Sequence, residues 1–195
     1  MMPVCWSVLF VGGLLGFGAV CAAIGNAPGD PLQWAGIVLV TGTLAGLGAI
    51  DGKTRKIDPL WLSGLVGAGT LWWVGGSGPT PGEALIAAGL GAAAGFAFGA
   101  VPIAVAEVLG RRWPFQPGDA LLFAAMGWVL GLEALPRALV MGAVFGLAYG
   151  GWLRRRRRRP LARGHVPLGP GMAAGGIAAF LGMNLPRTGI GPGLV

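Results

Sequence analysis

The sequence predicts an all-α integral-membrane protein, a polytopic bundle of about six to seven transmembrane helices. Of its 195 residues, 54% are hydrophobic and only 11% are charged, and the mean hydropathy is +0.72. A soluble domain carries about 25% charged residues, so this chain has too few to cover an apolar core in water. Its 39 Gly and 15 Pro residues do not indicate disorder, because disordered chains are poor in apolar residues. We therefore expect a single membrane domain over residues 1–195.

Each predicted helix is a run of apolar residues bounded by charges or by Gly and Pro. The runs cover residues 3–25, 34–51, 59–76, 83–109, 118–133, 137–153 and 166–184. The first run has no basic start and exceeds the 7–15 apolar residues of a secretory signal, which favours a retained span. The fifth run is short for a bilayer that needs about 20 residues, so its status as a full crossing stays open.

The basic residues predict how these helices are oriented. Twelve of the 14 Lys and Arg residues fall in connections that follow the second, fourth and sixth runs. They are Lys53, Arg55, Lys56, Arg111, Arg112, Arg154 to Arg159 and Arg163. By the positive-inside rule, that side is the cytoplasm. The six-Arg run is expected to anchor a helix end and to attract anionic phospholipid. Nucleic acid is excluded as a partner because the charges lie between apolar runs and not on a soluble face.

Small residues four apart predict where helices touch, since they let backbones approach closely in lipid. The longest such ridge is Gly91, Gly95 and Gly99. Shorter ridges are Gly42 with Gly46, and Gly171 with Gly175. We therefore expect much of the glycine content to serve helix packing.

Three acidic residues lie at the cytoplasmic ends of apolar runs: Asp51, Glu107 and Asp119. An ionisable group costs about 2.5–3.5 kcal/mol at the centre of a membrane helix and less toward the interface, so such residues are functional candidates. Two crossings separate Asp51 from Asp119, which returns the chain to the same face at a similar depth. The structural alternative is that Asp119 is only a helix N-terminal acid and Asp51 only a span boundary.

The sequence provides neither a set of metal ligands nor a nucleophile paired with a base. Cys5 and Cys21 form no CxxC pair, and His165 is the single histidine. A zinc site or a Ser/His or Cys/His arrangement therefore cannot be assembled. We expect no metal and no cofactor.

Three separated segments resemble the prepilin leader peptidase family, the GxGD-type membrane aspartyl proteases that process type IV prepilins. The first is DGKTRKIDPL, residues 51–60. The second is GDALLFAAMGWVLG, residues 118–131, and the third is VPLGPGMA, residues 166–173. Their order, spacing and membrane sidedness match the family, and the resemblance extends from about Thr41 to Ala179.

The segments also depart from the family pattern. Gln116 stands where the GxGD signature has its first Gly, and Leu121 stands where a Lys is usual. The order Asp58-Pro59 reverses the usual one. The Cys-rich cytoplasmic insert of longer members has no counterpart, so N-methylation of the product is not predicted.

The resemblance implies a function and its residues. It makes Asp51 and Asp119 the catalytic pair of an aspartic endopeptidase in the bacterial cytoplasmic (inner) membrane, with its active face toward the cytoplasm. Gly118, Pro117 and Gln116 would support the active-site loop. The implied substrate is a type IV prepilin or type II secretion pseudopilin, which loses its basic leader after a Gly that precedes its apolar helix.

Two further acids, Glu107 and Asp58, are candidates for contact with the basic leader. For Glu107 we favour the alternative that it balances Arg111, four residues on. Within the pair, a helix N-terminus favours an ionised Asp119 and a helix C-terminus a protonated Asp51, which predicts Asp119 as the base. Gly118 is expected to provide close approach and permissive dihedral angles.

Two non-enzymatic functions remain as alternatives. In a small transporter or scaffold, Asp51, Glu107 and Asp119 would line a proton or cation path, and acids would be distributed through the depth of the membrane. An inactive relative that holds pilin-like proteins would be in keeping with the substitutions Gln116 and Leu121.

Overall fold

The computed structural model describes residues 31–54, 57–75, 80–110, 116–156 and 169–184. Within these ranges the chain is helical apart from short turns, and no strand is present. The helices are α2 (Pro31–Thr54), α3 (Pro59–Gly75), α4 (Pro81–Val108), α5 (Pro117–Arg156) and α6 (Gly169–Asn184). The predicted helices at 34–51, 59–76, 83–109 and 166–184 are thus confirmed within a few residues. The predicted helix at 3–25 lies outside the described residues.

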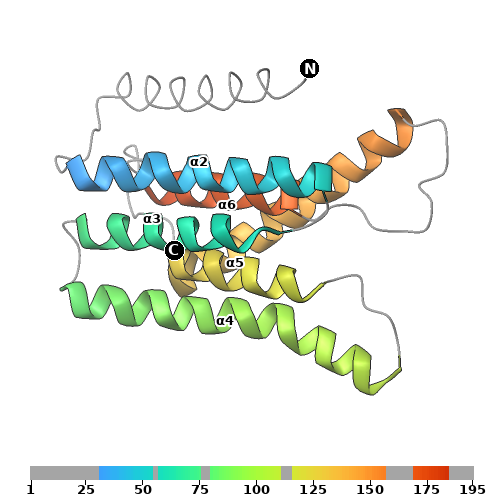
Figure 1. The fold of residues 1–195 in the computed structure, drawn as a ribbon, viewed down its shortest axis with the longest axis horizontal. Coiled ribbons are helices and arrows are strands. Elements are labelled where there is room, and N and C mark those ends of the chain that lie inside the picture. Colours follow the sequence, from blue (N-terminus) through green and yellow to red (C-terminus); the bar gives the residue numbers. More distant parts are fainter. Residues whose placement is uncertain (1–30, 55–56, 76–79, 111–115, 157–168, 185–195) are drawn as a thin grey trace, which may run out of the picture.

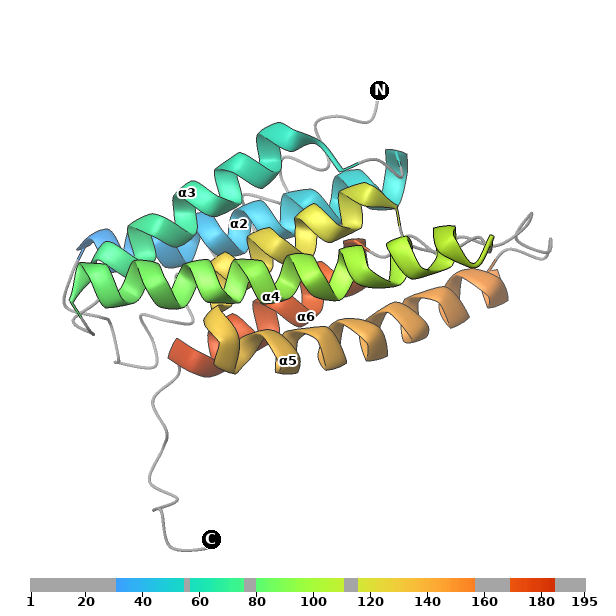
Figure 2. The same ribbon diagram turned by 90° about the horizontal axis from the view of Figure 1, so that it is seen from below.

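The two predicted helices at 118–133 and 137–153 join differently from expected. The connection predicted at 134–136 is wrong, because the chain is helical there and breaks at Gly131, with φ 65° and ψ −177°. A positive φ is readily adopted by Gly and strained for other residues. Pro136 lies five residues after this break, inside the helical second half. Figure 1 and Figure 2 show the halves of α5 running in opposite directions, as a helical hairpin.

The hairpin is fastened to α3 by two tryptophans. The Trp73 indole Nε1–H donates to the carbonyl oxygen of Trp128 at 2.9 Å, an acceptor that the break at Gly131 releases from regular helical bonding. The Trp128 Nε1–H in turn donates to Thr70 Oγ1 at 3.1 Å. Both indoles therefore satisfy polar groups at a point where lipid would offer none.

The glycine ridge of α4 packs as predicted. A Cβ added at Gly91 or Gly95 would collide with the backbone of α5, at Gly127 and Phe123. At Gly99 the added Cβ would lie 2.6 Å from the Ala120 Cα. The ridge therefore lets α4 lie backbone to backbone on the first half of α5.

The α6 ridge and Gly46, one glycine of the α2 ridge, also meet neighbouring helices. Gly171 and Gly175 of α6 approach the backbone of the second half of α5 near Gly142, and a Cβ at Gly171 would lie 2.7 Å from its carbonyl oxygen. On α2, Gly46 lies against the ring of Trp61 from α3. Close glycine contacts thus hold α6 against α5 and α2 against α3.

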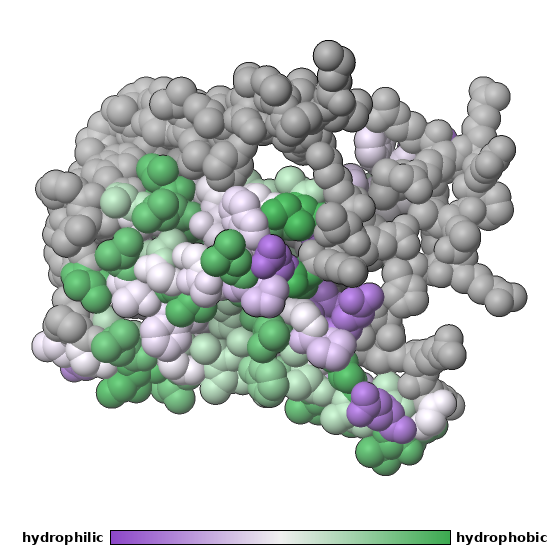
Figure 3. All heavy atoms as spheres, in the orientation of Figure 1, coloured by the Kyte–Doolittle hydropathy of each residue, from purple (hydrophilic) through white to green (hydrophobic). Residues whose placement is uncertain are grey.

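Large apolar side chains cover the outside of α4 and of the second half of α5. The most exposed on these two helices include Ile86, Leu90, Val101, Val140, Val144 and Leu147, which are 54–79% exposed. Figure 3 shows hydrophobic residues along the outer edge formed by α4. Two stretches are long and apolar enough to cross a membrane, Gly82–Val108 and Pro117–Trp152, the second of which contains the reversal at Gly131. The total of six to seven spans stays a prediction.

The helices alternate in direction, so their termini gather at two ends of the bundle (Figure 1, Figure 2). The ends of α2, α4 and α5 and the starts of α3, α5 and α6 lie together, and we name this the Asp51 end. The start of α2, the end of α3, the start of α4, the Gly131 break and the end of α6 lie at the opposite end. All three predicted basic connections therefore leave from helix termini at the Asp51 end.

Candidate active site

Asp51 lies near the end of α2 and is only 8% exposed. Among the residues that the structure describes, it is the only charged side chain that is buried. Its Oδ2 accepts a hydrogen bond of 2.8 Å from the backbone N–H of Gly169, the first residue of α6. The carboxylate therefore fills an acceptor position at the start of another helix.

Asp119 is the third residue of α5 and is half-buried. Its Oδ2 accepts a hydrogen bond of 2.7 Å from the backbone N–H of Gln116, and its own N–H donates to the Gln116 carbonyl at 2.9 Å. This is the acid's part of a capping box, so the alternative that Asp119 serves its own helix start is confirmed locally. A carboxylate has about four acceptor sites, so this bond does not preclude acid/base chemistry.

Three helices meet at Gly176 of α6, and this contact fixes their register. A Cβ at Gly176 would lie 3.1 Å from Met126 Cε of α5 and 3.3 Å from Leu44 Cδ1 of α2. All three residues are buried in the core. Leu44 and Met126 therefore mark faces of α2 and α5 that point to the same place.

On each of these three helices, the residue seven positions from this contact toward the Asp51 end belongs to the candidate site. Seven residues after Leu44 is Asp51, seven before Met126 is Asp119, and seven before Gly176 is Gly169. Seven residues advance about 10.5 Å and return nearly to the same helix face. The Asp51–Gly169 hydrogen bond agrees with this register. Asp51 and Asp119 thus occupy corresponding levels at one end of the bundle.

The three residues before Asp119 were expected to support the active-site loop, with permissive dihedral angles at Gly118. Gln116 and Pro117 are exposed, and Gly118 is half-buried. A Cβ at Gly118 would lie 3.6 Å from Ile57 Cβ, which is ordinary van der Waals contact. Gly118 has no positive φ, so the expectation of permissive dihedral angles there is wrong. The protein's own packing leaves room for a methyl group at this position.

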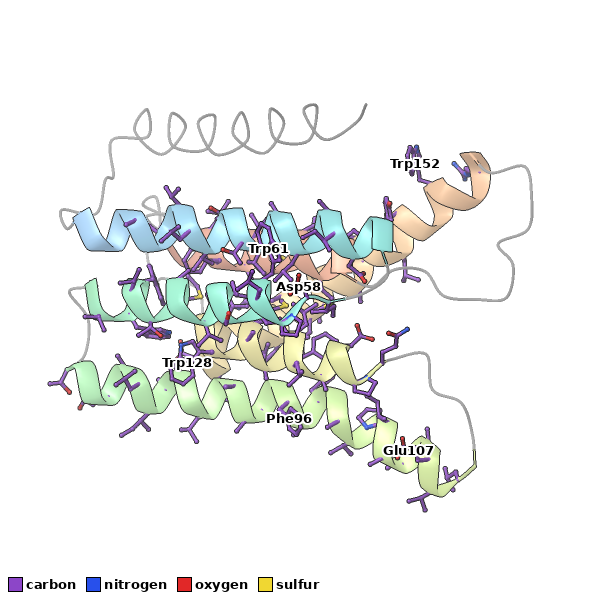
Figure 4. All side chains as sticks on the ribbon, in the orientation of Figure 1. Asp58, Trp61, Phe96, Glu107, Trp128 and Trp152 are labelled. Carbon is purple, nitrogen blue, oxygen red and sulfur yellow. The ribbon has the colours of Figure 1, made fainter. Side chains whose placement is uncertain are left out.

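The two acids considered for leader contact lie apart from the buried carboxylate. Asp58 is exposed, and its Oδ1 accepts the N–H of Leu60 at 2.9 Å, which makes it the N-cap of α3. Glu107 is exposed in the last turn of α4. Figure 4 shows the two near different helices at the Asp51 end. Arg111, with which Glu107 was expected to balance charge, lies outside the described residues.

The structure contradicts the electrostatic argument that predicted Asp119 as the base. It depended on Asp51 lying only at a helix C-terminus, whereas the Asp51 carboxylate also bonds to the first turn of α6. Both carboxylates therefore accept a backbone N–H at a helix N-terminus. Helix ends no longer distinguish the acid from the base.

Curated proteins similar to this chain identify its relatives. A protein of Bacillus subtilis is 38% identical over 96 residues, which cover 47% of this chain and 35% of that protein. Proteins of two Burkholderia pseudomallei strains are 39% identical over 100 residues, which cover 49% of this chain and 31% of theirs. All three are named prepilin leader peptidase/N-methyltransferase.

The matched half of the chain is homologous to prepilin leader peptidases. The predicted resemblance is therefore confirmed, over about half of this chain. The matched part spans only about a third of the length of these relatives. No protein-family model matches the chain, and no solved structure is significantly similar to it.

The departures from the prepilin leader peptidase pattern leave the local hydrogen bonds intact. Gln116, in place of Gly, contributes through its backbone N–H and carbonyl, which any residue but Pro provides. Leu121, in place of Lys, is 50% exposed. Neither side chain is therefore needed to hold Asp119 at the start of α5.

No role was predicted for Gly169 from the sequence, although Gly169-Pro170 belongs to the third family-like segment. A Gly-Pro pair just before an apolar run is a signal for a helix start. It does not say which acceptor, 118 positions away in sequence, will meet the free N–H.

Among the described residues, no group of three or more His, Cys, Asp or Glu could hold a metal ion.

Proposed function

We propose that this protein is a membrane aspartic endopeptidase that removes the basic leader of type IV prepilin-like substrates. The observation that carries the proposal is the common register of Asp51 and Asp119 at one end of an apolar helix bundle. Homology to proteins named prepilin leader peptidases supports it. The cleaved bond would follow a Gly that precedes the apolar helix of the substrate.

The proposed chemistry needs only the two carboxylates and water. In the proposed mechanism, one carboxyl group is ionised and the other is protonated when water attacks. The ionised member takes a proton from the attacking water, and the protonated member gives one to the leaving amine. Peptide hydrolysis then proceeds without a covalent intermediate.

The aromatic residues near the end of α5 support a site at the membrane interface. Tyr149 and Trp152 stack with ring centroids 6.0 Å apart, and such residues favour the boundary between lipid and water. Gly146 contacts Gly171, and from this contact Tyr149 lies three residues toward the Asp51 end and Gly169 two. At about 1.5 Å per residue, the Asp51 carboxylate lies close to the level of this aromatic pair.

The distribution of acids supports a peptidase over a transporter. The six acids of the described residues lie near helix ends or at the Gly131 reversal: Asp51, Asp58, Glu83, Glu107, Asp119 and Glu133. A proton or cation path would place acids through the depth of the bundle. Four of the six lie at the Asp51 end, which favours chemistry at that surface: Asp51, Asp58, Glu107 and Asp119.

The side of the membrane follows from the basic connections. They leave from the Asp51 end, which makes that end cytoplasmic in a six- to seven-span protein of the bacterial inner membrane. Anionic phospholipid would bind there and screen the basic face from a basic leader. Asp58, exposed at this end, would contact the leader, whereas Glu107 would balance Arg111.

Leader cleavage tests the proposal directly. The purified protein is incubated with a type IV prepilin or a type II secretion pseudopilin, and loss of the leader is measured by mass. We expect cleavage by the wild type, and a loss of at least about a thousandfold in Asp51→Asn and Asp119→Asn. Glu133→Gln, the same change in an exposed acid at the opposite end, should retain activity. Cleavage by both Asp variants would exclude the mechanism, and none by the wild type would favour the inactive relative.

The names of the relatives also include an N-methyltransferase activity. For this chain we propose the peptidase activity alone, because the proposal rests on Asp51 and Asp119, two carboxyl groups suited to acid/base hydrolysis of a peptide bond. The mature product of the cleavage assay, incubated with a methyl donor, should keep the mass of its unmodified N-terminus. A mass increase of one methyl group would overturn this part of the proposal.

A further inference from the structure

The first turn of α6 holds the Asp51 carboxylate from the side opposite its own helix. Gly169 begins α6, and its N–H donates to Asp51 Oδ2 at 2.8 Å. The first N–H groups of a helix have no partner within it. The preceding residue in sequence is Leu168, whose side chain has no acceptor, and Pro170 has no N–H. Asp51 therefore supplies from another helix the acceptor that an N-cap side chain usually provides.

The contact leaves no space for a side chain at position 169. A Cβ there would lie 2.6 Å from both Cβ and Oδ2 of Asp51 and 2.8 Å from its Cγ. One turn earlier on α2, a Cβ at Gly48 would lie 2.8 Å from the Ala173 Cβ and 3.4 Å from the Pro170 Cα. Close crossing of α2 and α6 at Gly48 thus presses Asp51 against Gly169.

We propose that Gly169 is a positioning residue for the catalytic Asp51, acting through its backbone N–H and through its lack of a side chain. The inference rests on the proposed peptidase function. Holding Oδ2 with a fixed donor restricts the rotation of the carboxyl group, and this sets which direction the other oxygen, Oδ1, faces. Proton transfer needs that direction to be reproducible, because a misplacement of about 1 Å costs about a hundredfold in rate.

Gly171 offers a matched control for a substitution at Gly169. Both glycines lie in the first turn of α6, and an added Cβ would come within 2.6 Å of another atom at either position. At Gly169 the nearest atoms belong to the Asp51 side chain, whereas at Gly171 they belong to the backbone of Gly146 and Gly142 in α5. Gly171→Ala therefore disturbs packing without touching the carboxylate.

The first test compares the kinetics of the two variants on the full-length protein in detergent. For Gly169→Ala we expect kcat to fall about a hundredfold with little change in KM, and the pH-rate profile to shift, because the pair loses a donor to one carboxylate. For Gly171→Ala we expect lower thermal stability and an unchanged pH-rate profile. Wild-type kcat and pH profile in Gly169→Ala, or equal shifts in both variants, would overturn the inference.

The second test does not depend on peptidase activity. Thermal unfolding temperatures are measured for Asp51→Ala in three backgrounds: wild type, Gly169→Ala and Gly171→Ala. Because Gly169→Ala already breaks the contact, Asp51→Ala should lower the unfolding temperature less there than in the wild type, and by the full amount in Gly171→Ala. Additive effects in both backgrounds would refute the contact. A coupled cycle in a wild type without peptidase activity would refute the proposed function alone.

Discussion

Asp51 combines a structural and a proposed catalytic role in one carboxylate. Its burial is unfavourable for a charge, and the Gly169 N–H offsets part of that cost, since hydrogen bonds to charged groups contribute about 1.5–3 kcal/mol. The structural role needs only an acceptor oxygen, whereas the catalytic role needs a group that titrates. Substitutions can therefore separate the two.

Asp51→Asn keeps an acceptor for Gly169, and Asp51→Ala does not. We expect Asp51→Ala to lower the free energy of unfolding by about 1–3 kcal/mol more than Asp51→Asn, because it leaves a buried donor unsatisfied. Both variants should lose peptidase activity. Unfolding temperatures in detergent check the first expectation and leader cleavage the second. Equal stability of the two variants would show that the hydrogen bond contributes nothing.

A substitution at Gly118 distinguishes packing within the protein from contact with a substrate. A methyl group fits there, 3.6 Å from Ile57 Cβ, and no positive φ demands glycine. We expect Gly118→Ala to unfold within about 0.5 kcal/mol of the wild type, as substitutions without a clash usually do. If the substrate backbone approaches at this point, KM for the prepilin should rise severalfold. Unchanged kinetics would remove Gly118 from the active-site loop.

At the scale of elements, the reversal of α5 is held by Trp73 of α3. The Gly131 break frees the Trp128 carbonyl, and the Trp73 indole binds it. In an apolar surrounding an unpaired carbonyl is expensive, so the pairing of α3 with α5 stabilises the hairpin. The hairpin in turn presents its first half to the glycine ridge of α4.

Trp73→Phe keeps an aromatic ring and removes the indole donor. We expect it to lower the free energy of unfolding by about 1–3 kcal/mol, since the carbonyl of Trp128 loses its partner. Trp152→Phe, at an exposed position outside the hairpin contact, should cost less than about 0.5 kcal/mol. Thermal unfolding of the two variants measures the difference. Similar unfolding temperatures would contradict the anchoring role of Trp73.

For the whole molecule, the alternation of helix directions assigns each connection to one of two ends. Asp58 is exposed at the Asp51 end, and Glu133 is exposed at the opposite end, beside the Gly131 reversal. If the bundle spans the membrane as proposed, these two positions face different compartments.

Cysteine labelling in cells tests that orientation. Asp58→Cys and Glu133→Cys are made separately in a protein whose Cys5 and Cys21 are replaced by Ala. We expect an impermeant maleimide to label position 133 in cells with a permeabilised outer membrane, and position 58 only after the inner membrane is opened. Labelling of both positions from the same side would contradict the proposed topology.

The sequence by itself determined the helical class, four of the helix ranges, the packing role of the glycine ridges and the resemblance to prepilin leader peptidases over about half of the chain. These depend on features read along one dimension: runs of apolar residues, residues spaced by one helical turn, and short motifs. Asp51 was one of three acids expected at the cytoplasmic ends of apolar runs, because an acid there is rare. That Asp51 alone of the three is buried came from the structure.

Only the tertiary structure decided where α5 reverses and what Asp51 binds. The sequence pointed to a break at Ala134 to Pro136, but the helix breaks at Gly131. A positive φ costs little at Gly, and an indole of α3 donates to the carbonyl that the break frees. The Asp51–Gly169 bond joins residues 118 positions apart. Local patterns carry no information on such a pairing, since it arises from how closely α2 and α6 cross at Gly48.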